Sequence, residues 1–117
     1  MKALSPFEVV QVGFPYVETA QRKIRPAVIV TTSAFHECGV AWCLMITSSR
    51  HRPWPGDVEI DDLQAAGLVK PCVVRTAKMA TIPIGAAQSL GYLDAATRKR
   101  VGAAVLEGLA DLCRNGP

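Results

Sequence analysis

The stretch KIRPAVIV, residues 23–30, places a cation and a rigid residue at the start of an apolar run. Arg25 carries a planar guanidinium that stays protonated and suits a phosphate, above all one that gains charge in a transition state. Pro26 restricts the backbone beside it. The pair indicates a candidate phosphate site at the entry of a strand, while a plain surface arginine at a strand edge remains the simpler alternative.

A second apolar run, within MITSSRHRPW at residues 45–54, ends in hydroxyl and basic side chains. Thr47, Ser48 and Ser49 can bond a phosphate oxygen or a sugar hydroxyl, or they can satisfy loop amides in a turn. Imidazole is a common general base, so His51 is a minor candidate for proton transfer. No histidine and acid stand at a serine-hydrolase spacing, which argues against a nucleophilic serine.

A third strand end, in VVRTAKMAT, carries Arg75 and, shortly after it, Lys78. Strand alternation predicts that Arg75 faces outward if Val74 faces the core. Three aromatic residues in or beside the loops could stack on unpaired bases, namely Phe14, Tyr16 and Trp54. For Trp54, a lid over the core is an equally good reading.

Composition fits one folded domain spanning residues 1–117, with 50% apolar residues and a net charge of +3. The charge is too small to indicate nucleic acid by itself. Most of the basic residues of the chain lie in four clusters. These are Arg22, Lys23 and Arg25; Arg50, His51 and Arg52; Arg75 and Lys78; and Arg98, Lys99 and Arg100. The four cysteines form no C-x-x-C pair, so we expect no metal, and we expect a cytosolic protein with reduced thiols.

The elements that must position these residues are mostly strands. Alternation and β-branched residues predict strands at 7–14, 25–32, 39–48, 57–62 and 72–76, with a single helical turn at 63–68. The segment 84–93 is expected to close the sheet or to pass over it. Asp94 is expected to cap a helix that runs to about Cys113. Its apolar stripe comprises Val101, Val105, Leu109 and Leu112. The predicted fold is mainly β (α+β), a small antiparallel barrel or strongly bent sheet with a C-terminal helix.

The order of these segments resembles the PemK/MazF toxins of bacterial toxin–antitoxin systems. The likeness rests on GFPY, RPAVIV, a strand that ends in ITSS, then WPGDVEI, GLVKPCVVRTAKMATI and IGAAQSLGYL before the final helix. It runs from about Glu8 to Leu112. The resemblance implies an SH3-like barrel, a homodimer and cytoplasmic, metal-independent cleavage of single-stranded RNA without a cofactor. It also implies a cognate antitoxin, with which such toxins form a DNA-binding complex.

The resemblance also implies roles for particular residues. Arg25 matches the arginine that stabilises the scissile phosphate, Thr47 the hydroxyl residue that works with it, and Arg75 an arginine used for catalysis in the PemK branch. Two positions depart from the family pattern. Ala77 stands where the PemK branch carries an acid, which removes one candidate base, and SPFEV replaces an RGD-like opening turn.

The implied reaction is in-line attack of a ribose 2′-hydroxyl, giving a cyclic phosphate and a 5′-hydroxyl. Arg75 would hold a neighbouring phosphate, and the base stays open between His51 and Glu18. The expected RNA-binding residues are Arg22, Lys23, Ser48, Ser49, Arg50, His51, Lys78 and Tyr16. Two other functions remain open, a non-enzymatic gyrase-poison-like inhibitor and a barrel that binds single-stranded RNA without cutting it.

Overall fold

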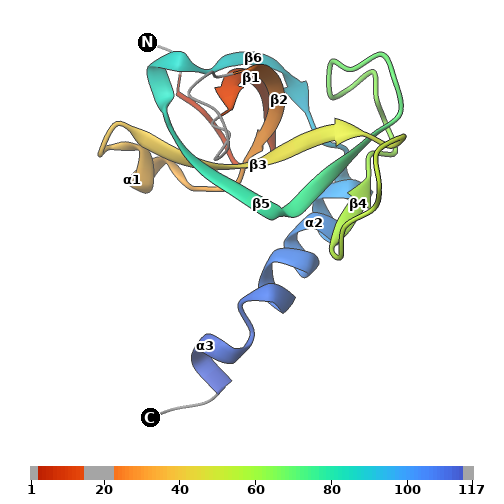
Figure 1. Cartoon of the computed structure of the whole chain (residues 1–117). Coiled ribbons are helices and arrows are strands. Elements are labelled where there is room, and N and C mark those ends of the chain that lie inside the picture. The colour runs from red at the N-terminus through yellow and green to blue at the C-terminus, as the bar shows by residue number, and fades with distance from the viewer. Residues whose placement is uncertain (1–2, 15–22, 115–117) are drawn as a thin grey trace.

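A computed structural model describes residues 3–14 and 23–114, which form a bent β-sheet with a helix at its C-terminal end (Figure 1). Its elements are β1 (Glu8–Phe14), β2 (Lys23–Ile29), α1 (Ser33–His36), β3 (Val40–Ser48), β4 (Asp57–Glu59), β5 (Cys72–Pro83), the 3₁₀ turn η1 (Ile84–Ala86), β6 (Gln88–Tyr92), α2 (Ala95–Gly108) and α3 (Asp111–Arg114). The mainly β class with a C-terminal helix is confirmed.

The six strands pair antiparallel in the order β4-β5-β3-β2-β1-β6. Segment 84–93 therefore joins the sheet, because β6 pairs with β1 at one edge. Across residues 3–14 and 23–114, β4 does not pair with β6, so the sheet bends strongly without closing into a barrel. Of the two forms expected from the sequence, the bent sheet is the one observed.

Several predicted elements change their extent. The strand expected at 57–62 ends at Glu59. The strand expected at 72–76 continues to Pro83, because β3 pairs with Cys72–Arg75 and, beyond a register shift between Leu44 and Met45, with Met79–Pro83. The helical turn expected at 63–68 is a series of turns that ends at Gly67. Gly67 has φ +75°, and a Cβ there would lie 2.2 Å from the Leu90 carbonyl oxygen, so only glycine fits.

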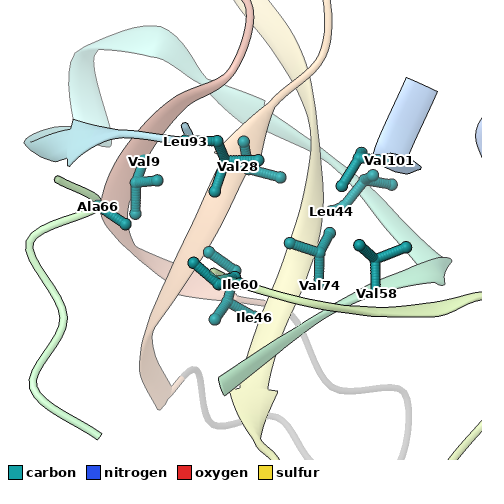
Figure 2. Packing of buried hydrophobic residues seen from close by; sticks show 10 residues of the cluster. All are labelled: Val9, Val28, Leu44, Ile46, Val58, Ile60, Ala66, Val74, Leu93 and Val101. Carbon is teal, nitrogen blue, oxygen red and sulfur yellow. The ribbon is translucent and has the colours of Figure 1, made fainter. Parts of the chain in front are cut away.

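Alternation along the strands gives the sheet two apolar faces. One face carries Val9, Val28, Leu44, Ile46 and Val74, and we call it the helix face because Val101 of α2 packs there (Figure 2). The opposite face carries a second cluster that includes Val10, Ala27, Ile29, Cys43, Met45 and Ile82. With both faces covered by apolar side chains, the central strands read as nearly continuous apolar runs.

The C-terminal helix begins as predicted and then departs from the prediction. The Asp94 side chain accepts a hydrogen bond from the Thr97 N–H (3.0 Å), which confirms the N-cap. Val101 is fully buried, but Leu109 is 48% and Leu112 77% exposed. The expectation that the whole stripe packs on the core is therefore wrong, because α2 extends beyond the sheet and α3 lies farther out still (Figure 1).

Candidate nucleic-acid interface

Strand register places the polar residues of three strand ends on the opposite face. Arg75 of β5 pairs with Met45 of β3 and with Asp57 of β4, and Thr47 of β3 pairs with Val73. Directly opposed residues point to the same side of a sheet, as do residues two apart along a strand. Asp57, Arg75 and Thr47 therefore share the face of Met45.

Arg25 belongs to the same face. The β2–β3 pairing ends with Ala27 opposite Met45, and Arg25 lies two residues before Ala27, on the same side of β2. Arg25 is half-buried and pairs with Val12 of β1. Arg25 and Thr47 thus lie on one face of neighbouring strands, each two residues beyond the last pair that joins them.

The Thr47 hydroxyl is joined to an imidazole. Thr47 is only 6% exposed, and its Oγ1 lies 2.7 Å from His51 Nδ1 in a shared hydrogen bond. The chain reverses just after β3, where the His51 N–H donates to the Ser48 carbonyl (3.1 Å), and this turn carries the ring back over the strand end. His51 itself is exposed. When Nδ1–H donates to Thr47, Nε2 keeps its lone pair and can accept a proton.

The neighbouring serine hydroxyls serve the turn, which is the second of the two readings that the sequence left open. Ser48 Oγ accepts a hydrogen bond from the Arg50 N–H (3.2 Å), and Ser49 Oγ donates to the Pro71 carbonyl (3.3 Å). Both serines nevertheless line a cavity of about 350 Å³, together with Arg50, Pro71 and Lys70. Lys70 escaped the sequence reasoning, although it stands directly before the PCVVR strand.

Strand alternation predicts an outward-pointing Arg75, but in the structure its side chain is covered. Val74 does face the helix side and Arg75 the other, but Arg75 is only 7% exposed because the 50–57 loop covers it. Its Nε donates to Asp57 Oδ1 (3.1 Å), and its Nη2 donates to Asp57 Oδ2 (3.0 Å) and to the Arg52 carbonyl (2.9 Å). The Trp54 ring covers the guanidinium, with Cζ 4.4 Å from the ring centroid.

These contacts give Arg75 a structural role. Two of its three guanidinium nitrogens already bond protein acceptors, so it anchors the loop that carries His51 and Trp54. Direct contact with a phosphate, which the family resemblance implied, stays a prediction. Trp54 is a lid, as one sequence reading held, but it lies over Arg75.

Asp57 supplies a carboxylate that the sequence reasoning did not assign to this site. It follows Gly56, whose φ of +85° lets the loop turn into β4, and the Thr76 hydroxyl donates to the Gly56 carbonyl (2.7 Å). An acid had been sought two residues after Arg75, where Ala77 stands. Asp57, eighteen residues before Arg75, instead pairs with it through the β4–β5 ladder.

The pKa of Asp57 is lowered. Burial tends to raise it, but the hydrogen bonds from the Arg75 side chain and the Trp54 N–H, with the positive charge of Arg75, outweigh burial. The two side chains are only 8% and 11% exposed, so removing one charge leaves the other in a poorly solvated position.

We expect Asp57→Asn to lower the free energy of unfolding by about 3 kcal/mol at neutral pH, the low end for breaking a buried pair. The contribution of Asp57 should be complete above its ordinary pKa of 3.8 and be lost as pH falls through the lower folded-state value. Urea unfolding at a series of pH values measures this difference. Asp61→Asn is the matched control, because the Asp61–Arg100 pair is about half exposed and should contribute less than about 1 kcal/mol. Equal losses in the two variants would contradict the prediction.

Some expected site residues cannot be placed. Arg22 and Tyr16, expected to bind RNA, lie outside the described residues, as does the candidate base Glu18. Lys23 begins β2, but its side chain, like that of Phe14, is not described. Lys78 is half-buried, and its Nζ lies 5.8 Å from the centroid of the Trp54 ring.

The thiols and helices of the described residues suggest no further site. Cys38, Cys43 and Cys72 are free, and burial raises the pKa of the Cys43 thiol to about 12 despite a backbone hydrogen bond from Ala80. Within residues 3–14 and 23–114, no group of three or more potential ligands is placed to hold a metal ion. No helix in the described ranges is long and apolar enough to cross a membrane.

Three solved structures of similar fold are distant from this chain in sequence. MazF (Form-I) from Deinococcus radiodurans is 19% identical with a TM-score of 0.75, over 94% of this chain and 99% of that one. MazE–MazF (Form-II) from the same organism is 19% identical with a TM-score of 0.69, over 93% and 97%. An endoribonuclease in complex with its cognate antitoxin, from a mycobacterial species, is 17% identical with a TM-score of 0.72, over 92% and 96%. At such identities the likeness shows the fold.

Among curated protein sequences, none matches this chain significantly. Residues 5–109, however, match the family described as the PemK-like, MazF-like toxin of type II toxin–antitoxin systems. The match spans all six strands and α2, including both strand ends that carry Arg25 and Thr47. The chain therefore belongs to the family of PemK-like, MazF-like toxins of type II toxin–antitoxin systems.

Proposed function

We propose that this chain is a toxin that acts as an endoribonuclease on single-stranded RNA. The observation that supports the proposal is that Arg25 and Thr47 belong to the same face of neighbouring strands, each two residues beyond the last β2–β3 pair, with His51 bonded to the Thr47 hydroxyl. A guanidinium and an imidazole at one site are the groups needed to stabilise a phosphorane-like transition state and to move a proton. Relatives of the same fold that are described as endoribonucleases support it.

In the proposed reaction the ribose 2′-oxygen attacks the adjacent phosphorus. A bond forms between the 2′-oxygen and phosphorus, and the bond from phosphorus to the 5′-oxygen breaks. His51 Nε2 takes the proton of the 2′-hydroxyl, and the departing 5′-oxygen takes a proton from solvent water, so the products are a 2′,3′-cyclic phosphate and a 5′-hydroxyl. Arg25 neutralises charge on the non-bridging oxygens. Because the guanidinium supplies the positive charge, the reaction as proposed needs no metal.

Thr47 serves as a positioning residue in this scheme. Its hydroxyl is largely covered and already bonded to His51, so it fixes the direction of the ring, and the scheme uses the tautomer in which Nδ1–H donates to Thr47 Oγ1. The end of β3 next to Thr47 is basic, since the exposed Arg50 and Lys70 line the cavity beside Ser48 and Ser49. We propose that these cations, with Lys78, bind phosphates on either side of the cleaved bond. RNA binding by Arg22, Lys23 and Tyr16 stays a prediction.

Partners follow from the same proposal. The relatives crystallised as complexes with an antitoxin, so we propose a cognate antitoxin that covers the RNA site of this chain. We further propose a homodimer that acts in the cytoplasm, where its RNA substrate is found. The cleavage motif depends on the loops around the site.

The test is cleavage of a set of single-stranded RNAs by the purified protein in the presence of EDTA. We expect fragments that end in a 2′,3′-cyclic phosphate and begin with a 5′-hydroxyl, detected by mass spectrometry and by labelling of the 5′ ends with polynucleotide kinase without prior phosphatase. Double-stranded RNA of the same sequence is the control and should resist. Binding without cleavage on varied RNAs would favour the non-cleaving barrel, and trapping of gyrase on cleaved DNA would favour the inhibitor.

A further inference from the structure

Trp54 is held in place and yet remains exposed. Arg75 packs against its ring at 4.4 Å, and the Trp54 backbone is fixed at both polar groups, because its N–H donates to Asp57 Oδ2 (2.9 Å) and its carbonyl accepts from the Asp57 N–H (3.2 Å). Pro53 and Pro55 restrict the backbone on either side. Even so, 41% of the residue is open to solvent.

Such an arrangement suits recognition better than stability. A buried ion pair is weak evidence for stability, and here it orients a large aromatic ring that the core does not use. A tryptophan that is ordered before binding loses little conformational entropy when a partner stacks on it. Aromatic side chains in this state are the usual platforms for unpaired bases, since every base has a π-face.

The ring stands close to the proposed reaction centre. Arg75, beneath it, pairs with Met45, and Thr47 lies two residues along the same strand. Diagonal neighbours on adjacent strands are about 7–8 Å apart, so one RNA strand can reach both the ring and the His51 imidazole. Lys78 Nζ, 5.8 Å from the ring centroid, lies where it can meet the phosphate of a stacked nucleotide.

We infer that Trp54 is the stacking platform for an unpaired base next to the cleaved bond, with Arg75 and Asp57 as the residues that position it. This inference rests on the proposed function and adds a residue that determines substrate affinity. It assigns the requirement for single-stranded RNA to stacking, because a paired base cannot present its face to the ring.

Trp54 fluorescence tests the inference without cleavage. The chain has two tryptophans, so Trp42→Phe leaves Trp54 as the only one. The probes are short 2′-O-methyl oligoadenylate and oligouridylate, in which the attacking hydroxyl is blocked. We expect both to quench the emission of Trp54 as they bind, with binding followed independently by anisotropy of a labelled probe. Trp54→Phe is the matched control, because Trp42 is equally exposed at 40% but packs against Phe35, and its emission should not change.

Substitution of Trp54 measures how much the ring contributes to RNA affinity. Trp54→Leu keeps an apolar cover over Arg75 but removes the π-face, and we expect its Kd for the probes to rise by about five-fold to a hundredfold. Trp54→Phe should remain within a few-fold of the unaltered protein. For cleavable RNA the loss should appear in KM, with kcat nearly unchanged. Melting temperatures show whether each variant is folded, and the quenching measurement stands even if Trp54→Leu is not.

The outcomes separate this inference from the nuclease proposal. Quenching and binding without any cleavage would contradict the nuclease proposal and support Trp54 as a stacking platform. Cleavage with unchanged Trp54 emission, or with the same KM in Trp54→Leu, would overturn the platform alone. A protein that neither binds nor cuts single-stranded RNA would overturn both.

Discussion

Replacing Arg25 by alanine should reduce the rate of RNA cleavage by about a hundredfold to a thousandfold, the cost of removing one positioned donor from a developing oxyanion. The loss should appear in kcat, because the charge on the non-bridging oxygens rises as the 2′-oxygen attacks. The fold should survive, since Arg25 is half-buried at the entry of β2 and the core of that strand lies at Ala27, Val28 and Ile29.

Two further variants make the Arg25 experiment specific. Arg25→Lys keeps the charge but loses the planar fork, and should retain an intermediate rate. Arg100→Ala removes an exposed arginine of α2, whose pair with Asp61 is about half exposed, and should cleave as the unaltered protein does. Single-turnover rates with matched circular dichroism spectra measure all three. Full activity in Arg25→Ala would rule out the proposed site.

Much of the β-sheet was predictable because its signals are local. β1, β2 and β3 are runs of β-branched and apolar residues bounded by glycine, proline or polar turns, and both ends of β1 and β3 lie within one residue of their expected positions. For β2 the expected range extended slightly beyond the observed end at Ile29. The Asp94 cap was equally predictable, because the Asp94 carboxylate and the Thr97 N–H that donates to it lie only three residues apart in the sequence.

The pair of Asp57 with Arg75 was not predictable in the same way. It depends on β4 pairing with β5 in one register, and on the bulge at Leu44/Met45 that sets the register of β5 against β3. Alternation correctly told which side of the sheet Arg75 faces. It carries no information on whether a loop covers that side, and the closing of the 50–57 loop over Arg75 is a tertiary event.

Burial along the C-terminal helix also depends on tertiary structure that the sequence pattern does not contain. A period of three to four residues identifies an apolar stripe, but the stripe is buried only as far as the sheet beneath it extends. The sheet reaches Val101, and Val105 is half-buried, while Leu109 and Leu112 lie beyond it. Within residues 3–14 and 23–114, these two side chains are therefore left exposed.

The hydrogen bond between Thr47 and His51 could be predicted from the sequence only in part. The two residues are four apart, a spacing that a tight turn can bring into contact, and the turn-forming serines between them indicated a reversal. Which of Thr47, Ser48 and Ser49 meets the imidazole does not follow from the sequence, because that choice depends on strand twist at the end of β3. In the structure it is Thr47, which shares a face of the sheet with Arg25.

Replacing His51 by alanine should lower kcat by about a hundredfold or more, within the range for loss of a positioned general base, with little change in KM. The ring contacts solvent and Thr47, so the stability of the protein should stay within about 0.5 kcal/mol. Thr47→Val should cost only about tenfold, because it removes one hydrogen bond that orients the ring and leaves the imidazole itself.

Free imidazole provides the decisive measurement for His51. Added at millimolar concentration, it should restore part of the activity of His51→Ala, because it can occupy the vacated space and accept the 2′-hydroxyl proton. It should not restore Arg25→Ala, in which the base is present and the charge is missing. Rescue in neither variant, together with undiminished cleavage by His51→Ala, would place the base elsewhere and reduce His51 to an RNA contact. Rescue of His51→Ala alone assigns the proton to His51 and the phosphate charge to Arg25, the division of labour that the two strand ends suggest.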